Sequence, residues 1–482
     1  MRRAGVHSEH WKTWAALAAV VLFVVADAVA LLNHNYIIMA VPAVLLALVL
    51  MVSRLELSLI GMAFLTPFSV DAELLQGMDL SLPVEPLMMI FSLIFLVRAV
   101  LERPFGREFF KHPVTIAVLV MLGWMIVTSA LSQLPLVSFK HTAAQMWFIV
   151  TFYFGGCYVF RNRNRIGQFF WAYAIGLIAI ILLSTMKTIG HLHDLPTLHH
   201  AMRPFYNDHT AYGCVIALML PAALYFIFSR DSHGWNRLWW AVLFGIMALG
   251  LYLSFSRAAW ISLVAAVGVF FAVKMGMKVK WMMVVFALGV GLFYTYQGDL
   301  LYRMGKNNVD SSADLGNQVK SISNISTDAS NLERLNRWAS ALRMWEEHPV
   351  TGTGAGTYQF LYASYQRSYQ LSTISTNAGD LGNAHSEYIG PLTEQGVPGV
   401  AIVVSLFLLT FTTGVKVYRK AKDPVTRHLA LAFTLSLLTY YVHGCFNNFL
   451  DTDKLAVPFW AFTAAVVALD LSSREEEKSI SL

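Results

Sequence analysis

Residues 166–189 read IGQFFWAYAIGLIAIILLSTMKTI, and the fold class follows from this stretch. It is almost entirely apolar, and its one charged residue, Lys187, lies near its end. About 20 consecutive apolar residues in a helix cross the hydrocarbon core of a bilayer. Similar stretches recur along the 482 residues, which are 56% hydrophobic and only 13% charged. The sequence therefore predicts an all-α polytopic membrane protein and excludes a soluble enzyme, a disulfide scaffold and a disordered protein.

The apolar stretches predict about fourteen helices, of which about 12–14 are transmembrane. Their approximate spans are 13–32, 36–52, 55–69, 84–101, 114–132, 141–160, 166–189, 209–229, 237–255, 258–274, 279–296, 386–417, 425–443 and 454–471. The first span is too long for the apolar core of a signal peptide. We therefore expect three parts, which are about eleven N-terminal transmembrane helices (1–296), one large loop domain (297–384) and about three C-terminal transmembrane helices (385–482).

The distribution of lysine and arginine predicts the orientation of these helices. With the N-terminus in the cytoplasm, the cytoplasmic segments hold 23 of the 35 basic residues, the short outer segments five and the long loop seven. Short loops rich in basic residues stay on the cytoplasmic side. We therefore expect a multi-pass membrane protein with both termini in the cytoplasm. The large loop then faces outward.

Composition also bears on partners and cofactors. The 35 basic and 29 acidic residues give a net charge of +6, but the basic residues are scattered through short loops, so we expect no nucleic acid partner. The three cysteines form no CxxC pair. Five histidines lie within 190–209, without thiolates and without a strong ligand spacing. We therefore expect no metal and no cofactor, whereas membrane lipids are expected partners.

The large loop is predicted to contain amphipathic helices. Ser330 and Glu333 form a capping box that begins one helix, which His348-Pro349 ends. Glycines then recur at every second position over 352–356, which indicates a flexible turn that resembles a phosphate cradle only loosely. A second stretch carries four tyrosines on one helical face, suited either to stacking on sugar rings or to lying on lipid headgroups. They are Tyr358, Tyr362, Tyr365 and Tyr369.

Ionisable side chains gather at the predicted outer ends of the helices, which indicates a site at the outer membrane surface. Arg257 begins a membrane helix, where an arginine either binds phosphate or extends its charge to the interface. Arg334 and Arg337 form a second cationic pair, either on a solvated helix face or, with Arg257, as a clamp on a diphosphate.

His385 is the strongest candidate for a catalytic side chain. An imidazole near neutral pH can take a proton from an attacking hydroxyl, although a histidine here can also cap the helix. Glu387 is a candidate for orienting it. A possible substrate groove comprises Glu387 and the end of an outer loop, where the alternative is a cap formed by Asn207 or Asp208. Its loop residues are Arg203, Tyr206, Asn207 and His209.

Four motifs in this order resemble the O-antigen ligase and O-antigen polymerase superfamily. The first is Ser254-Phe-Ser-Arg257-Ala-Ala-Trp260, and the second is Arg334-x-x-x-Trp338-x-x-Ala-Leu342. The third is His348-Pro349-x-x-Gly352-x-Gly354-x-Gly356. The fourth is Ala384-His385-Ser-Glu-Tyr388-Ile-x-x-Leu392-x-Glu394-x-Gly396-x-Pro398-Gly399. Together they cover about 200–400, while the flanking helices match in hydropathy only.

The resemblance implies a metal-independent glycosyltransferase embedded in the bacterial inner membrane, with its active site on the periplasmic face. The donor would be a glycan on undecaprenyl diphosphate. Arg257 and Arg334 would bind the diphosphate, and His385 would activate the acceptor hydroxyl. Arg337 is a less direct match, because the arginine four residues before the tryptophan is Arg334. This chain has Ser386 where the family more often has asparagine. A single displacement at the sugar would invert its anomeric centre.

Three functional hypotheses remain at this point. The first, which we favour, is an O-antigen ligase in lipopolysaccharide biosynthesis that moves a glycan from undecaprenyl diphosphate to lipid A–core. The second is an O-antigen or exopolysaccharide polymerase, in which the acceptor is a lipid-linked glycan. The third, a lipid or polysaccharide transporter, would favour internal repeats and helices broken near the midplane. No internal repeat stands out in the sequence, so we rank the transporter last.

Overall fold

A computed structural model describes residues 41–75, 78–188, 200–229, 234–282, 284, 329–371, 375 and 382–481. The described chain is almost entirely helical, with a single two-stranded sheet, which confirms the predicted fold class. The predicted helix at 13–32 and most of the predicted helix at 279–296 lie outside the described residues. The chain divides into two compact units, Met1–Ser58 and Leu59–Leu482.

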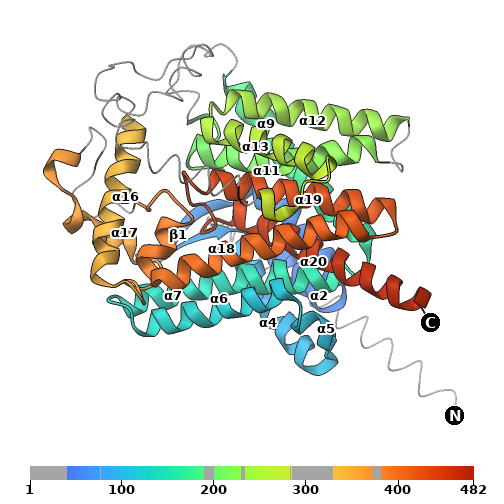
Figure 1. The fold of residues 1–482 in the computed structure, drawn as a ribbon, viewed down its shortest axis with the longest axis horizontal. Coiled ribbons are helices and arrows are strands. Elements are labelled where there is room, and N and C mark those ends of the chain that lie inside the picture. Colours follow the sequence, from blue (N-terminus) through green and yellow to red (C-terminus); the bar gives the residue numbers. More distant parts are fainter. Residues whose placement is uncertain are drawn as a thin grey trace, which may run out of the picture. The chain divides into compact units, whose positions relative to one another are not determined.

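Helices succeed one another along the described chain (Figure 1). Helix α2 (Val41–Ser53) lies in the first unit, and α3 (Leu55–Leu65) begins there and ends in the second. The second unit continues with β1 (Val70–Leu75), β2 (Met78–Leu82), α4 (Val84–Glu102), α5 (Arg107–Phe110), α6 (Pro113–Ala130), α7 (Pro135–Phe148), a π-helical turn (Ile149–Gly155), α8 (Gly156–Val159), α9 (Arg163–Thr188), α11 (His209–Phe228), α12 (Trp235–Leu253), α13 (Arg257–Lys274), α16 (Ala329–Glu347), α17 (Tyr358–Leu361), α18 (Ile389–Lys420), α19 (Pro424–His443) and α20 (Asp453–Ser481).

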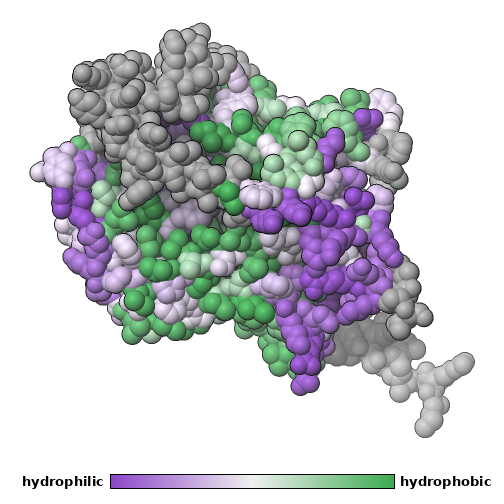
Figure 2. Space-filling model, viewed as in Figure 1, coloured by the Kyte–Doolittle hydropathy of each residue, from purple (hydrophilic) through white to green (hydrophobic). Residues whose placement is uncertain are grey.

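Eight of the described helices are long and apolar enough to cross a membrane. They are α4, α6, α9, α11, α12, α13, α18 and α20. On the face of the second unit shown in Figure 2, hydrophobic side chains cover the middle of these helices. Hydrophilic side chains gather on α16 at one end and around the ends of α18 and α20 at the other. An apolar band between two polar ends suits a bilayer, and the chain is a multi-pass membrane protein.

Helices α19 and α20 form the interior of the second unit, and the other helices surround them. Most of α20 is buried, and Trp460 is among its largest buried side chains. Helix α19 packs against α11, α13 and α18. The outer helices α4, α12 and α13 instead expose large apolar side chains such as Val100, Leu249 and Val264. Water would penalise these exposed side chains, whereas lipid tails accommodate them.

Three predicted helices differ in detail from the structure. The predicted 141–160 helix is three segments, because the chain winds as a π-helix over Ile149–Gly155. The predicted 55–69 helix ends at Leu65, and the unpredicted hairpin of β1 and β2 follows a short 3₁₀ turn. Helix α18 is bent at Gly396, whose φ of 69° and ψ of −167° are not helical. Pro398 follows, and its ring cannot continue a regular helix.

Gly414 determines how closely α18 approaches α19. A Cβ atom on Gly414 would lie 1.7 Å from Oγ1 and 3.0 Å from Cβ of Thr434. Thr434 cannot rotate away without losing the 2.7 Å hydrogen bond that its hydroxyl donates to the Ala430 carbonyl. The glycine therefore permits a contact that no other residue allows at this distance.

We expect Gly414→Ala to lower the unfolding temperature in detergent, because overpacking a buried contact costs about 1–3 kcal/mol. Gly268→Ala is the matched control, since Gly268 lies on α13 and a Cβ atom added there would meet no neighbouring group within 4 Å. Alanine favours the helix there, so the control should be neutral or slightly stabilising. Equal unfolding temperatures for the two variants would contradict the close approach of α18 and α19.

Candidate functional site

Five segments that are distant in sequence meet at the end of the second unit where α16 lies. They are the first turns of α16, the segment 382–388, the turn between α19 and α20, and the first residues of α11 and α13. Backbone hydrogen bonds tie some of them together, and the Glu387 amide donates to the Gly444 carbonyl at 2.7 Å. His209 Nδ1 donates to the Ser254 carbonyl at 2.8 Å, which joins the beginnings of α11 and α13. We treat this end as the candidate site.

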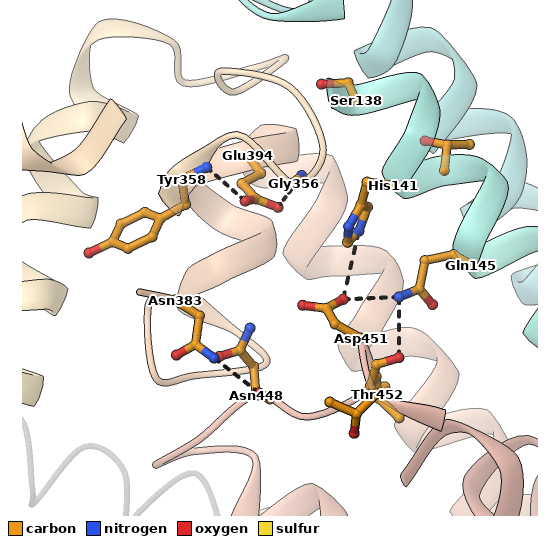
Figure 3. A network of polar contacts seen from close by, with 12 residues as sticks. Ser138, His141, Gln145, Gly356, Tyr358, Asn383, Glu394, Asn448, Asp451 and Thr452 are labelled. Carbon is orange, nitrogen blue, oxygen red and sulfur yellow. Dashed lines mark hydrogen bonds and ion pairs between the residues drawn. The ribbon is translucent and has the colours of Figure 1, made fainter. Parts of the chain in front are cut away.

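His385 lies in the segment that leads into α18, with its backbone in the left-handed region at φ 49°. Its amide donates to Asn383 Oδ1 at 3.1 Å, and Asn383 Nδ2 donates to the Asn448 carbonyl at 3.3 Å. Figure 3 shows this link between Asn383 and Asn448. A non-glycine residue in this conformation is held there by its surroundings. In the described part of the chain, no side chain hydrogen bonds to the His385 imidazole, which therefore remains able to act on a substrate.

The charge state of His385 follows from its neighbours. Burial lowers its pKa to about 3, and the positive charges of Arg334 and Arg337 contribute to this shift. The carboxylates of Asp208 and Glu333 act in the opposite direction without overcoming it. The imidazole is therefore neutral near pH 7 and retains a lone pair that can accept a proton.

Arg334 connects α16 with the turn between α19 and α20. Its Nε donates to the Phe446 carbonyl at 3.1 Å, and its Nη2 donates to Asn447 Oδ1 at 3.5 Å. The side chain is half-buried and lies close enough to Asp208 for its charge to lower the pKa of that carboxyl. The charge of Arg334 therefore acts both on the predicted base, His385, and on Asp208 at the beginning of α11.

Arg337 is more deeply buried than Arg334 and is held by several groups. Its Nε donates to Glu333 Oε1 at 2.7 Å, and its Nη1 donates to the Asn383 carbonyl at 3.2 Å. The guanidinium also lies 4.9 Å from the centroid of the Tyr362 ring. A side chain at Gly382 would overlap this guanidinium. Arg337 thus supports the segment that carries His385, and its charge still reaches the imidazole.

Arg257 is the first residue of α13, directly after a tight turn. Phe255 in this turn has φ 49°, and Ser254 and Ser256 are buried against α11. A Cβ on Gly213 would lie 2.7 Å from Ser254 Oγ and from Ser256 Cβ, so glycine permits this contact. The turn places half-buried Arg257 beside the beginning of α11, where His209 and Asp208 lie.

The predicted groove residues of the 203–209 segment lie together, but their contacts are with other parts of the protein. Tyr206 is only 2% exposed, and its ring packs edge-on against that of Tyr212. Asn207 Nδ2 donates to Asp71 Oδ2 at 2.8 Å, which ties the segment to β1. The Arg203 carbonyl accepts from Lys187 at 2.8 Å. His209 connects this segment to the turn before Arg257, because its Nδ1 donates to the Ser254 carbonyl.

Asp208 was predicted only as a possible cap, and the structure gives it a second role as well. It caps α11, because Oδ1 accepts from the Thr210 amide at 3.0 Å. It also faces both Arg334 and His385. Although burial acts to raise the pKa of Asp208, His209, Thr210 and Arg334 lower it, so the carboxylate stays ionised. It is a negative charge beside the candidate base.

Glu387 does not contact His385, and its carboxylate instead holds the turn between α19 and α20. Glu387 Oε1 accepts from the Phe449 amide at 2.8 Å and the Leu450 amide at 3.1 Å, and from the Tyr440 hydroxyl. Burial raises its pKa to about 7, and the charge of Asp451 adds to this effect. Glu387 therefore fixes the turn to which Arg334 is bonded.

The glycine-rich turn at Gly352–Gly356 already binds a carboxylate. Glu394 on α18 accepts from the Gly356 amide at 2.8 Å and the Tyr358 amide at 3.0 Å, as Figure 3 shows. Gly352, Gly354 and Gly356 all have positive φ, which L side chains rarely adopt. The end of the turn and the first residue of α17 are thus tied to α18, because the Gly356 and Tyr358 amides both donate to the Glu394 carboxylate.

The second amphipathic helix predicted for the loop is wrong. Helix α17 ends at Leu361, and two short 3₁₀ turns follow, so the four tyrosines do not share one face. Tyr358 and Tyr362 are buried and stacked at 5.2 Å, whereas Tyr369 is 74% exposed. Tyr358 and Tyr362 pack in a cluster with Ala341 and Met344 of α16, and the backbone becomes extended at Gln366.

Two residues near Arg334 were not predicted. His443, the last residue of α19, is 1% exposed, and neither ring nitrogen has a hydrogen-bond partner among the described residues. Asn447 is 2% exposed, and within the same part of the chain its Nδ2 also has no partner, although its Oδ1 accepts from Arg334. In the sequence His443 merely ends an apolar run, so no spacing signal marks it. Among the described residues, no cluster of three or more acidic, histidine or cysteine side chains suits a metal ion.

This region is similar to a known protein family. Residues 242–404 match the family model described as O-antigen ligase. The matched range contains the turn before Arg257, the α16 arginines and His385. It therefore confirms the resemblance predicted from the four motifs. No curated protein matches the chain.

Glu387 leads to a prediction about pH. Because its pKa is raised in the folded state, the folded carboxyl binds a proton between about pH 4.5 and about pH 7, where the unfolded one is ionised. Its contribution to stability is therefore present at low pH and is lost as the pH rises to about 7. We expect Glu387→Gln to flatten this part of the profile of unfolding temperature against pH. Parallel profiles for the wild type and the variant would contradict it.

Proposed function

Starting from the similarity of residues 242–404 to O-antigen ligases, we propose that the chain transfers a glycan from undecaprenyl diphosphate to a hydroxyl of lipid A–core. The observation that carries the proposal is a neutral imidazole, His385, beside the cationic Arg334 at one end of a bundle of membrane helices. A base and a charge clamp are what transfer from a lipid diphosphate requires.

The proposed reaction is a single displacement. The acceptor oxygen attacks the anomeric carbon, the bond from this carbon to the phosphate oxygen breaks, and undecaprenyl diphosphate leaves. His385 takes the hydroxyl proton, and Arg334 and Arg257 stabilise the charge that grows on the departing diphosphate. Attack opposite the leaving group inverts the anomeric centre. The reaction as proposed uses no metal and no cofactor.

The surroundings of His385 suit each stage of this reaction. Before attack the imidazole is neutral, because burial and the two arginines disfavour its protonated form. When it accepts the proton, the ionised Asp208 faces the new imidazolium and stabilises it. Arg337 supports the backbone at Asn383 and adds positive charge, so we assign it to positioning the base as well as to the clamp.

We propose that this site lies on the periplasmic face of the inner membrane, with both termini in the cytoplasm. The basic residues of the short loops support this orientation, because they gather at the opposite ends of the helices, around Arg163, Lys274 and Arg419. The 297–384 segment would then be the periplasmic loop domain, and the α16–α17 core is its described part.

A polymerase would use the same donor, clamp and base, with a lipid-linked glycan as acceptor. The acceptor therefore decides between the two, and one assay distinguishes them. Purified protein is supplied with undecaprenyl-diphosphate-linked glycan and lipid A–core in the presence of EDTA. Glycan on lipid A–core supports the ligase, and a longer lipid-linked glycan supports the polymerase. Lipid transport into vesicles without any glycosidic product would contradict both.

His385→Ala should abolish transfer but leave donor binding intact. A positioned general base contributes about 10²–10⁴-fold, so we expect the rate of undecaprenyl diphosphate release to fall by this factor. Arg257→Ala should weaken both transfer and donor binding, because the lost charge contacts the diphosphate. His428→Ala is the control, since His428 is exposed on α19 near its first turn. Near-wild-type transfer by His385→Ala would show that the base is another residue.

The pH profile of the rate tests the charge state of His385. A histidine with its ordinary pKa of 6.5 would give an acid limb near that value, but the pKa here is lowered to about 3. We therefore expect kcat/KM for the donor to show no acid limb between about pH 5 and about pH 8. A limb near pH 6.5 that disappears in His385→Ala would contradict the proposed environment of the imidazole.

A further inference from the structure

The last residue of α19, His443, is the most unusual polar side chain near the site. It is 1% exposed, yet neither Nδ1 nor Nε2 has a hydrogen-bond partner in the part of the chain that the structure describes. Buried polar groups in proteins are nearly always hydrogen bonded, and each exception needs a physical reason. An imidazole contributes one N–H donor and one acceptor in its neutral form, so two binding positions stand unused here.

The neighbours of His443 are those of the diphosphate clamp. The charges of Arg334 and Asp208 both act on it, as they act on His385. Arg334 is bonded to Phe446 and Asn447, which follow His443 by one turn of chain. The His443 ring also lies 5.8 Å from the Phe449 ring, tilted by 41°, which limits its rotation. Arg334 thus has one histidine on the α18 side and another on the α19 side.

A second unused group lies beside it. Asn447 Oδ1 accepts a hydrogen bond from Arg334, while Asn447 Nδ2 has no hydrogen-bond partner among the described residues. Asn447 is 2% exposed, so this amide is as well buried as His443. An N–H from each residue, next to a guanidinium, forms a set of donors. Such a set suits the oxygens of a phosphate, which accept several hydrogen bonds at once.

We propose that His443 is a donor-binding residue, whose ring N–H donates to a phosphate oxygen of the lipid diphosphate held by Arg334. This inference rests on the proposed function and extends its clamp from arginines to neutral donors. The Asn447 amide supplies a second neutral donor to the same group. Neutral donors add directional hydrogen bonds without adding charge, so the free site carries less self-repulsion than a site with further cations.

The experiment measures binding of undecaprenyl diphosphate to the purified full chain in detergent. The variants are His443→Ala, His443→Gln and the control His428→Ala on the same helix. We expect His443→Ala to weaken binding about tenfold or more, since hydrogen bonds to charged groups are of this size. His443→Gln should recover part of the affinity, because its amide also donates. His428→Ala should bind like the wild type.

The unfolding temperature without ligand separates binding from a structural role. If His443 acts on the diphosphate, replacing this unpartnered group should not lower the unfolding temperature of the free protein. The stabilisation by added undecaprenyl diphosphate should instead shrink. A purely structural histidine would do the reverse, lowering the unfolding temperature in His443→Ala and His443→Gln alike. That pattern, or wild-type affinity in a folded His443→Ala, overturns the inference.

The same titration distinguishes the two proposals from each other. Arg334→Ala serves as the reference for loss of the clamp. If the wild type binds undecaprenyl diphosphate, and Arg334→Ala loses it while His443→Ala does not, only the inference about His443 is wrong. If the wild type binds no undecaprenyl diphosphate and transfers no glycan, the proposed function is wrong, and the role of His443 is overturned with it.

Discussion

The contact of Arg334 with the turn after α19 joins the helix outside the bundle to the helices within it. Arg334 Nε donates to the Phe446 carbonyl, and this bond brings a long cationic side chain to a fixed place. Its Nη2 also donates to Asn447 Oδ1, so two groups of the planar fork are held by the same turn. The rest of the site is arranged around this guanidinium, with His385, Asp208 and His443 all within reach of its charge.

Two buried carboxylates hold the backbone segments around this guanidinium without contacting it. Glu387 holds the turn between α19 and α20, and Glu394 holds the glycine turn after α16. Each accepts two backbone amides, so each connects two segments that the sequence separates widely. Both follow His385 along the chain, one just before α18 and one within it. These two carboxylates thus hold the backbone on the C-terminal side of His385, while the His385 imidazole itself makes no such structural contact among the described residues.

The sequence supplies candidate side chains for the site but not their contacts. Arg257 and His385 stand out because a charge at the end of an apolar helix is costly, whereas Arg334 stands out as one of a cationic pair in the large loop. Whether an arginine points to substrate or to Glu333 depends on packing, so Arg334 and Arg337 looked alike. The regular spacing of the tyrosines predicted one helix, but α17 ends at Leu361 and the backbone is extended at Gln366, so the spacing alone did not reveal where the helix ends.

His443 is a residue that the sequence did not reveal and the structure did. An imidazole at the end of an apolar run carries no periodic signal, and only its burial without a partner distinguishes it. Repulsion between positive charges gives a reason for a site that combines few cations with neutral donors. Arg334 and Arg337 already disfavour protonation of His385, and a further cation would add to the repulsion in the free protein. In the proposed reaction the arginines would supply positive charge where the leaving diphosphate develops its negative charge, and neutral donors would complete the binding.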